Sequence, residues 1–161
     1  MSVSANDFKD VMAQVATTVT VVTAESSDGP IGLTVSAFTS VSVDPPIVLV
    51  CIDKVVGTIE AMLEAPGFTV NMMPEDSEDE AMLFATHGAD RFGSTKWQDA
   101  RSPEAGPVLA SAFAYFACAT VKRTEIGDHW VIFGEVTAVG LPKDGSMPLV
   151  WHDRGFAKVA R

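Results

Sequence analysis

Hydroxyl side chains recur at alternate positions in the stretch 32–46, which carries the clearest chemical pattern in the sequence. Alternate residues of an extended strand share one face. The face predicted to point away from a core carries four hydroxyls and one ring: Thr34, Ser36, Phe38, Ser40 and Ser42. The opposite face is apolar and is predicted to point toward a core: Leu33, Val35, Ala37, Val41 and Val43.

The hydroxyl face has two interpretations. It suits the solvent-facing side of an edge strand. It equally suits the wall of a ligand pocket, because hydroxyls and nearby strand-end amides can hydrogen-bond a polar heterocycle and a phosphate together. The alternation by itself leaves both interpretations open.

Lys54 is the second candidate for chemistry, since it is the only basic residue between Lys9 and Arg91. It follows an apolar run, so we expect it at the exit of a strand. A phosphate contact would explain a lysine in so acidic a region, and a solvated surface lysine is the alternative.

Other kinds of site lack their sequence signatures. The chain has no GxGxxG after a strand, no GxxxxGK[ST], no HExxH and no GxSxG. Its histidines, His87, His129 and His152, are scattered, so no metal site is predicted from local spacing. A Ser-His-Asp triad stays open, although no pattern favours one.

Composition sets the class of protein. The chain has 161 residues and 17.1 kDa, with 47% hydrophobic and 20% charged residues, which predicts one folded domain over 1–161 without long disorder. Eleven basic against 21 acidic residues give a net charge of −10, so nucleic acid is not an expected partner. Residues 1–90 hold 14 of the acidic and only 2 of the basic residues.

A cytoplasmic location away from membranes is expected. The longest uncharged stretch, 105–121, has 17 residues and is broken by Gly106-Pro107, whereas a spanning helix needs about 20 apolar residues. The N-terminus has no basic and apolar leader pattern. Cys51 and Cys118 lie in apolar runs and are interpreted as buried thiols in a reducing compartment.

Periodicity predicts a β-rich fold with a few short helices. Ser4 and Asp7 resemble a capping box before an apolar stripe of Phe8, Val11, Met12 and Val15. Two further helices are expected at 56–64 and 78–86, the second beginning in the acidic run 75–80. Strands are predicted at 18–23, 32–43, 47–53, 68–72, 113–124, 129–139 and 149–152, the last being the final strand. These short strands indicate a compact β-barrel or sandwich.

The ordered motifs resemble the short-chain flavin reductase family, the reductase components of two-component flavin monooxygenases. The resemblance covers nearly the whole chain and begins with the 32–46 stretch and its closing Asp44-Pro45-Pro46. It continues through Cys51-Ile52-Asp53-Lys54, Phe68-x-Val70-Asn71, Asp90-Arg91-Phe92 with Trp97, Gly127-Asp128-His129, Phe133-Gly134-Glu135-Val136, Pro148-Leu149-Val150 and Arg154-Gly155-Phe156.

This resemblance implies a fold and an activity. Members fold as a mainly antiparallel, Greek-key-like FMN-binding split β-barrel with a few short helices, usually as a homodimer with the flavin near the subunit interface. They use NADH or NADPH to reduce FMN or FAD, and the reduced flavin often passes to a partner oxygenase. Hydride transfer from nicotinamide C4 to flavin N5 needs orientation more than acid–base chemistry.

The resemblance also implies roles by position. The isoalloxazine and ribityl chain are expected against Thr34, Val35, Ser36, Ala37, Ser40, Val41 and Ser42. The ribityl-phosphate end is expected near Cys51, Ile52, Asp53, Lys54 and Thr58, with Asp53 contributing backbone only. Phe92 is expected close to the flavin, His129 on the nicotinamide side as the catalytic contact, and Arg154 on the pyrophosphate of the dinucleotide.

The same sequence suits other functions. The same barrel can pass electrons to another acceptor, such as a corrin or a metal chelate. A flavin- or haem-binding protein without turnover is a third interpretation. His129 also suits a plain turn residue and Arg154 a plain surface arginine. The sequence does not distinguish FMN from FAD or NADH from NADPH.

Overall fold

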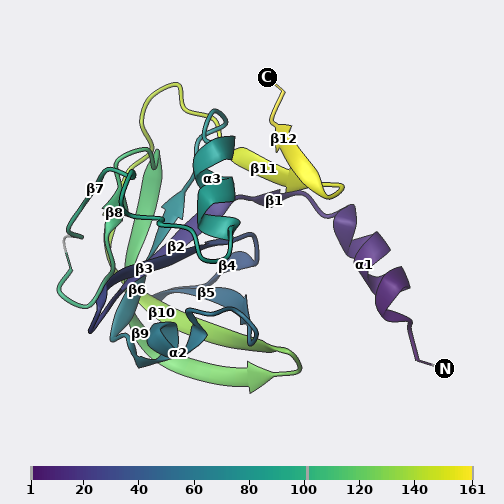
Figure 1. Ribbon diagram of the computed structural model, residues 1–161, viewed down its shortest axis with the longest axis horizontal. Coiled ribbons are helices and arrows are strands. Elements are labelled where there is room, and N and C mark those ends of the chain that lie inside the picture. The colour runs from purple at the N-terminus through teal and green to yellow at the C-terminus, as the bar shows by residue number, and fades with distance from the viewer. Residues whose placement is uncertain (1, 101, 161) are drawn as a thin grey trace.

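A seven-stranded antiparallel sheet forms the body of the molecule (Figure 1). The computed structural model describes residues 2–100 and 102–160. The strands of this sheet are β2 (Thr20–Ser26), β3 (Gly29–Val35), β4 (Phe38–Val43), β5 (Pro46–Asp53), β6 (Gly67–Met72), β9 (Ala114–Ile126) and β10 (His129–Gly140). Their order is β3-β2-β6-β9-β10-β5-β4.

The two edges of this sheet are β3 and β4, although these strands follow each other directly in the chain. Only Ser36 and Ala37 separate them, and the Cys51 N–H donates a hydrogen bond to the Ala37 carbonyl at 2.9 Å. The curled sheet is thus joined by a short crossing rather than by a ladder between its edges. This arrangement confirms the mainly β, antiparallel split barrel that the resemblance implied.

The crossing corrects the prediction of one strand over 32–43. Leu33 and Val35 are buried as expected. Beyond the crossing the expected faces are wrong, since Val41 is 50% and Val43 91% exposed, and Ala37 is exposed as well. The chain changes from one sheet edge to the other at Ser36, and a bulge on β4 shifts the register again, so a single alternation does not hold.

Two apolar clusters hold the fold together. The first fills the barrel with β-branched and aromatic side chains, including Val22, Val50, Phe68 and Ile132, and the short helix α2 (Ile59–Glu64) packs against it. The second lies outside the barrel under helix α3 (Glu78–Ala85), where Phe84 is fully buried. Gly32 permits this docking, because a Cβ at Gly32 would lie 2.9 Å from the Phe84 ring.

Small sheets complete the structure. Strands β7 (Trp97–Gln98) and β8 (Val108–Leu109) pair with each other. A second small sheet joins β1 (Thr17–Thr18), β11 (Leu149–His152) and β12 (Gly155–Lys158) in the order β1-β11-β12. The strand expected to be last is therefore followed by another. The turn between them is Asp153 and Arg154, both with positive φ, of 48° and 61°, as in a two-residue type I′ hairpin.

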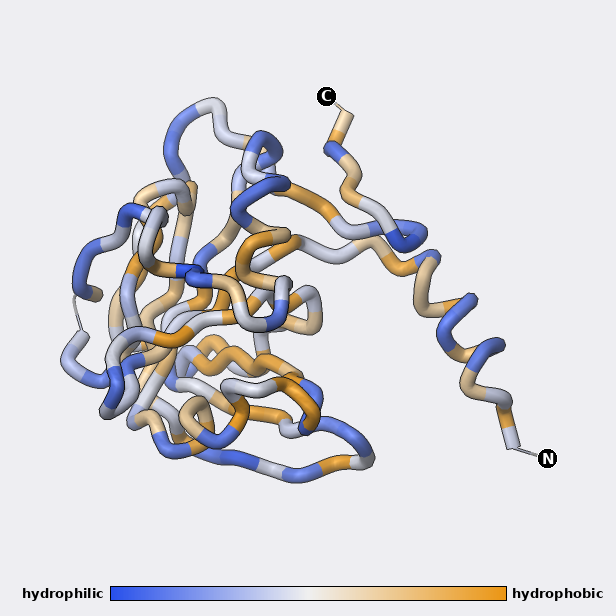
Figure 2. Tube along the Cα trace, viewed as in Figure 1, coloured by the Kyte–Doolittle hydropathy of each residue, from blue (hydrophilic) through white to orange (hydrophobic). Residues whose placement is uncertain are grey.

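Helix α1 (Ala5–Ala13) stands clear of the barrel (Figure 1). The structure confirms Ser4 as the N-cap, because the Asp7 N–H donates to Ser4 Oγ, but the Asp7 carboxylate accepts from the Ser4 hydroxyl and not from the Ser4 backbone N–H, as a full capping box requires. The helix buries none of its residues, and hydrophobic positions recur along it in Figure 2. Within 2–100 and 102–160, no helix has the length and apolar character needed to cross a bilayer.

Candidate functional site

A small cavity beside the β3–β4 crossing brings together two of the expected site residues, Thr34 and Ser36. It measures 190 Å³ and is lined by Val19, Thr34, Ser36, Ala81, Met82, Ala85, Trp151 and Phe156. Binding pockets for whole small ligands usually measure about 300–1,000 Å³, so this slot suits the ring portion of a larger ligand.

The hydroxyls of the slot differ in their freedom. The Thr34 hydroxyl donates to the Ala81 carbonyl at 2.5 Å, so it ties β3 to α3. Ser36 is exposed at the crossing. Ser36 is therefore the hydroxyl of the slot that is available to a ligand.

The aromatic side of the slot comes from the end of the chain, which sequence reasoning did not assign to it. The Trp151 and Phe156 rings pack edge to face, with centroids 5.3 Å apart and an interplanar angle of 79°. They face each other across the β11–β12 ladder, where directly opposed side chains interact. The sequence signal that could have revealed this aromatic pair was Trp151 and Phe156 on either side of a two-residue turn.

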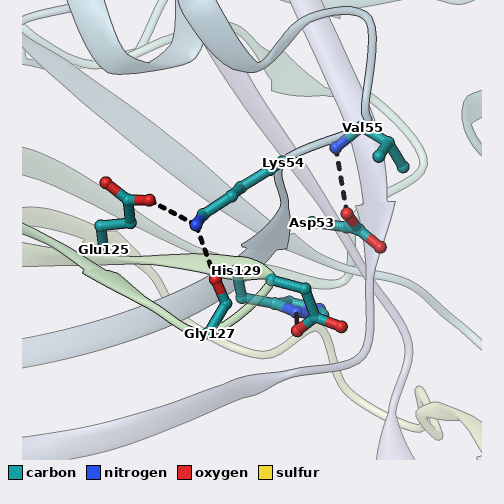
Figure 3. Close-up of polar contacts among 7 residues, drawn as sticks. Asp53, Lys54, Val55, Glu125, Gly127 and His129 are labelled. Carbon is teal, nitrogen blue, oxygen red and sulfur yellow. Dashed lines mark hydrogen bonds and ion pairs between the residues drawn. The ribbon is translucent and has the colours of Figure 1, made fainter.

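The loop after β5 holds the residues expected near a phosphate. Asp53 accepts a hydrogen bond from the Val55 N–H at 3.0 Å through its carboxylate (Figure 3). Lys54 forms an ion pair with Glu125 and donates to the Gly127 carbonyl at 2.6 Å. The Lys54 ammonium group is thus already partnered, while the Thr58 hydroxyl is buried and has no hydrogen-bond partner in the structure.

His129 lies next to this loop, at the start of β10. Its partner across the ladder is Asp53, so the two side chains share one face of the sheet. The His129 Nδ1 atom is 2.7 Å from the Asp128 carboxylate (Figure 3). This hydrogen bond is the main reason why the pKa of Asp128 lies below its usual value.

Phe92, on the loop after α3, packs between two other aromatic rings. Its ring packs edge to face against Phe84 at 5.3 Å and against Trp97 at 6.2 Å, measured between centroids. Beside it, the Arg91 guanidinium donates to the Gly32 carbonyl at 2.7 Å and to the Thr86 carbonyl at 3.0 Å. Burial lowers the pKa of Arg91. These contacts fix the 86–92 loop beside β3.

The remaining expected residues are spread out. Val35 and Ile52 point into the barrel core, so only their backbone can face a ligand. On β4, Ser40 and Val41 are exposed and Ser42 is half-buried. Arg154 is paired with Asp10 of α1. Cys51 is half-buried, which corrects its expected full burial, whereas Cys118 is buried.

A larger cavity of 640 Å³ lies elsewhere, where β8 and the start of β9 meet the end of β10. None of the expected site residues lines it. The small slot at the crossing is the better candidate for the flavin site, because residues of the hydroxyl pattern and aromatic rings both line it.

Comparison with known proteins then decides the family. The family model for the flavin reductase like domain matches residues 12–160. This chain belongs to that family.

Similar proteins agree with this membership. A probable flavin reductase of Rhizobium meliloti is 40% identical over 132 residues, which cover 81% of this chain and 42% of the relative. The reductase component of a Rhodococcus opacus 4-nitrophenol 4-monooxygenase/4-nitrocatechol 2-monooxygenase is 40% identical over 130 residues, covering 81% and 69%. The structure of the NADH:FAD oxidoreductase SgcE6 of Streptomyces globisporus C-1027 superposes with a TM-score of 0.89 at 32% identity, covering 99% and 97%.

The chain spans about half the length of the first of these curated relatives. This flavin reductase-like domain nevertheless has features that fit a flavin. The Thr58 hydroxyl is buried and has no hydrogen-bond partner among the described residues, as expected of a group whose partner is an oxygen of a bound ligand. The slot at Ser36 offers aromatic and aliphatic walls for a flat ring.

Proposed function

We propose that this protein is an NAD(P)H-dependent flavin reductase, which transfers hydride from NADH or NADPH to FMN or FAD. The proposal takes residues 1–161 as one flavin reductase-like domain. The observation that carries it is the slot at the β3–β4 crossing, where Ser36 meets Trp151 and Phe156 in a member of the flavin reductase family. When bound, the flavin supplies the acceptor atom for the hydride.

The residues of this chain bind the flavin and orient it toward the nicotinamide. Ser36 is placed to hydrogen-bond the polar edge of the isoalloxazine, and the Trp151–Phe156 pair keeps water from one side of the ring. Thr58 and the backbone of 51–54 receive the ribityl-phosphate end. His129 lies beside Asp53 and orients the nicotinamide side, so its replacement should impair use of NADH more than binding of flavin. No side chain need act as an indispensable acid or base.

Filling the slot tests this assignment. Ala85 is an exposed residue of α3 that lines the slot, so Ala85→Phe would occupy the space without disturbing the core. We expect at least tenfold weaker binding of FMN, measured by quenching of flavin fluorescence, at an unchanged melting temperature. Ala110→Phe is the control, because Ala110 is also exposed and lines the larger cavity instead. Equal FMN affinities of the wild type and both variants would show that the flavin does not bind in the slot.

We also propose that the protein is a homodimer in which α1 contributes to the interface. The apolar stripe of α1 is exposed, with Phe8 61%, Val11 70% and Met12 47% exposed, and Val15, just past the end of the helix, is 47% exposed. The C-terminal end of the helix is anchored to the β11–β12 turn, since its C-cap residue Gln14 donates to the Asp153 carboxylate at 3.1 Å. A second copy of the chain would cover this stripe, because apolar faces of this kind are otherwise costly in water.

Sedimentation equilibrium measures this directly. We expect a mass of twice 17.1 kDa for wild type and a shift toward one chain for the double variant Phe8→Glu, Val11→Glu. Lys9→Glu, which adds negative charge beside the stripe, serves as the control and should stay dimeric. A wild-type protein that sediments as a single chain contradicts the dimer.

A partner oxygenase is the proposed destination of the reduced flavin, as the name of the Rhodococcus opacus relative suggests. A cytoplasmic location is proposed with it, because both cysteines are free thiols and thiols persist in reducing compartments.

A further inference from the structure

Two polar groups without partners flank Gly57, and they come from different parts of the chain. One is the buried Thr58 hydroxyl, for which the structure holds no hydrogen-bond partner. The other is the exposed imidazole of His87, on the loop after α3. Its Cε1 atom lies 3.6 Å and its Nδ1 atom 4.0 Å from the position of a Cβ on Gly57. Because residue 57 is a glycine, no side chain stands between the imidazole and this loop.

Two cations close to Thr58 or His87 in the sequence, Lys54 and Arg91, already donate hydrogen bonds within the protein. The Lys54 ammonium pairs with the Glu125 carboxylate and the Gly127 carbonyl. The Arg91 Nη1 and Nη2 groups donate to the Gly32 and Thr86 carbonyls, while its buried Nε–H has no hydrogen-bond partner among the described residues. By contrast, the described residues provide no hydrogen-bond or ion-pair partner for the His87 ring. The exposed His87 ring is therefore an unpartnered nitrogen donor beside the loop on which Thr58 lies.

We propose that His87 is a specificity-determining residue that selects phosphorylated flavins. Together with the Thr58 hydroxyl it donates a hydrogen bond to the phosphate at the end of the ribityl chain. This inference rests on the proposed function, which places the ribityl-phosphate end at the 51–58 loop. Hydrogen bonds from nitrogen donors to an anionic phosphate are stronger than neutral ones, whereas riboflavin, which ends in a hydroxyl, gains much less from the same donors. His87 therefore raises the affinity for FMN relative to riboflavin.

The test compares dissociation constants for FMN and riboflavin, measured by quenching of flavin fluorescence with the full-length protein. In wild type we expect FMN to bind more tightly. In His87→Ala we expect the FMN-to-riboflavin affinity ratio to fall by about tenfold, the effect of one lost hydrogen bond to a charged group. The riboflavin constant should stay unchanged. His87→Asn, which keeps a nitrogen donor, should retain part of the preference, and Thr58→Val should lose preference as His87→Ala does.

His152→Ala is the matched control, because His152 is likewise an exposed histidine but lies at the end of β11. It should leave the ratio unchanged. An unchanged ratio in His87→Ala overturns the proposal. So does an equal loss of affinity for both flavins, which would mean that His87 only shapes the loop. In either case the flavin reductase function stands, whereas failure of the wild-type protein to bind any flavin would overturn both.

Discussion

Asn71 is expected to be among the most costly single residues to replace, because one buried amide joins three segments. Asn71 is fully buried. Its Nδ2 group donates to the Val21 carbonyl and the Thr23 hydroxyl, both at 3.1 Å, and lies 3.4 Å from the Pro107 carbonyl. Its Oδ1 atom accepts from the Leu109 N–H at 2.9 Å. The amide therefore fixes the 107–109 segment onto β2 and β6.

The cost of Asn71→Ala follows from these contacts. The Leu109 N–H is left in a buried place without its acceptor, and each such unsatisfied group costs about 1–3 kcal/mol. The carbonyl acceptors lose a donor and a small cavity opens, so we expect a loss of about 3 kcal/mol in the free energy of unfolding. For a chain of this size, each kcal/mol lowers the melting temperature by about 2–4 °C. The expected decrease is therefore about 6–12 °C.

Urea unfolding followed by far-ultraviolet circular dichroism measures this loss. Asn6→Ala is the control, since Asn6 is an exposed asparagine on α1 and surface changes usually stay within about 0.5 kcal/mol. Asn71→Asp separates the two halves of the amide, because it keeps the acceptor for Leu109 but places a carboxylate against carbonyl oxygens. We expect Asn71→Asp to be at least as unstable as Asn71→Ala at pH 7. A loss below about 1 kcal/mol in Asn71→Ala would refute this reasoning.

Three further outcomes are expected. Gly134→Ala should lower the free energy of unfolding by about 1–3 kcal/mol through overpacking, since its Cβ would lie 2.6 Å from the Cys118 Cβ and 2.7 Å from the Phe68 ring. Gly155→Ala is the control and should be nearly neutral in the same urea titration, because the nearest atom to its Cβ lies at 3.9 Å. Equal urea midpoints for the two variants would contradict the packing argument. At pH 8 a disulfide reagent should modify at most Cys51 in the native protein, because burial raises the pKa of the Cys118 thiol to about 12; modification of both thiols before urea is added would be inconsistent with that burial. His129→Ala should return the Asp128 pKa toward its ordinary value. A carboxyl whose pKa is lowered in the folded state stabilises the fold above its unfolded pKa, and this stabilisation is lost as the pH falls. The unfolding free energies of wild type and variant should therefore converge in acid. An Asp128 pKa that does not change in the variant, measured by NMR, would refute the hydrogen bond.

The local elements were predictable from the sequence. The spacing of apolar residues predicted α2 and most strands, and the acidic run 75–80 indicated the start of α3. The Ser4–Asp7 pattern predicted the start of α1. Strands were predicted at 113–124 and 129–139, and these two pair as the long β9–β10 hairpin. These features depend on residues close together in the chain, so local patterns are sufficient to indicate them.

The crossing and the partners of the site were not predictable in the same way. Alternation over 32–43 says which residues share a face within one strand, but it does not show where the chain moves to the other sheet edge. The Lys54–Glu125 ion pair joins residues 71 positions apart, and the contact of His87 with Gly57 joins two loops. Such long-range pairs form only when the whole sheet curls into the barrel, and local sequence patterns do not predict which residues that brings together.

Oxidation of NADH and NADPH by the purified protein, with and without catalytic FMN or FAD, tests the central claim most directly. We expect oxidation that is strongly stimulated by added flavin, with one combination of nucleotide and flavin preferred. Turnover by a yellow protein without added flavin would keep the enzyme but make the flavin a resident group. The absence of oxidation with every combination, in a protein that is folded, would contradict a flavin reductase.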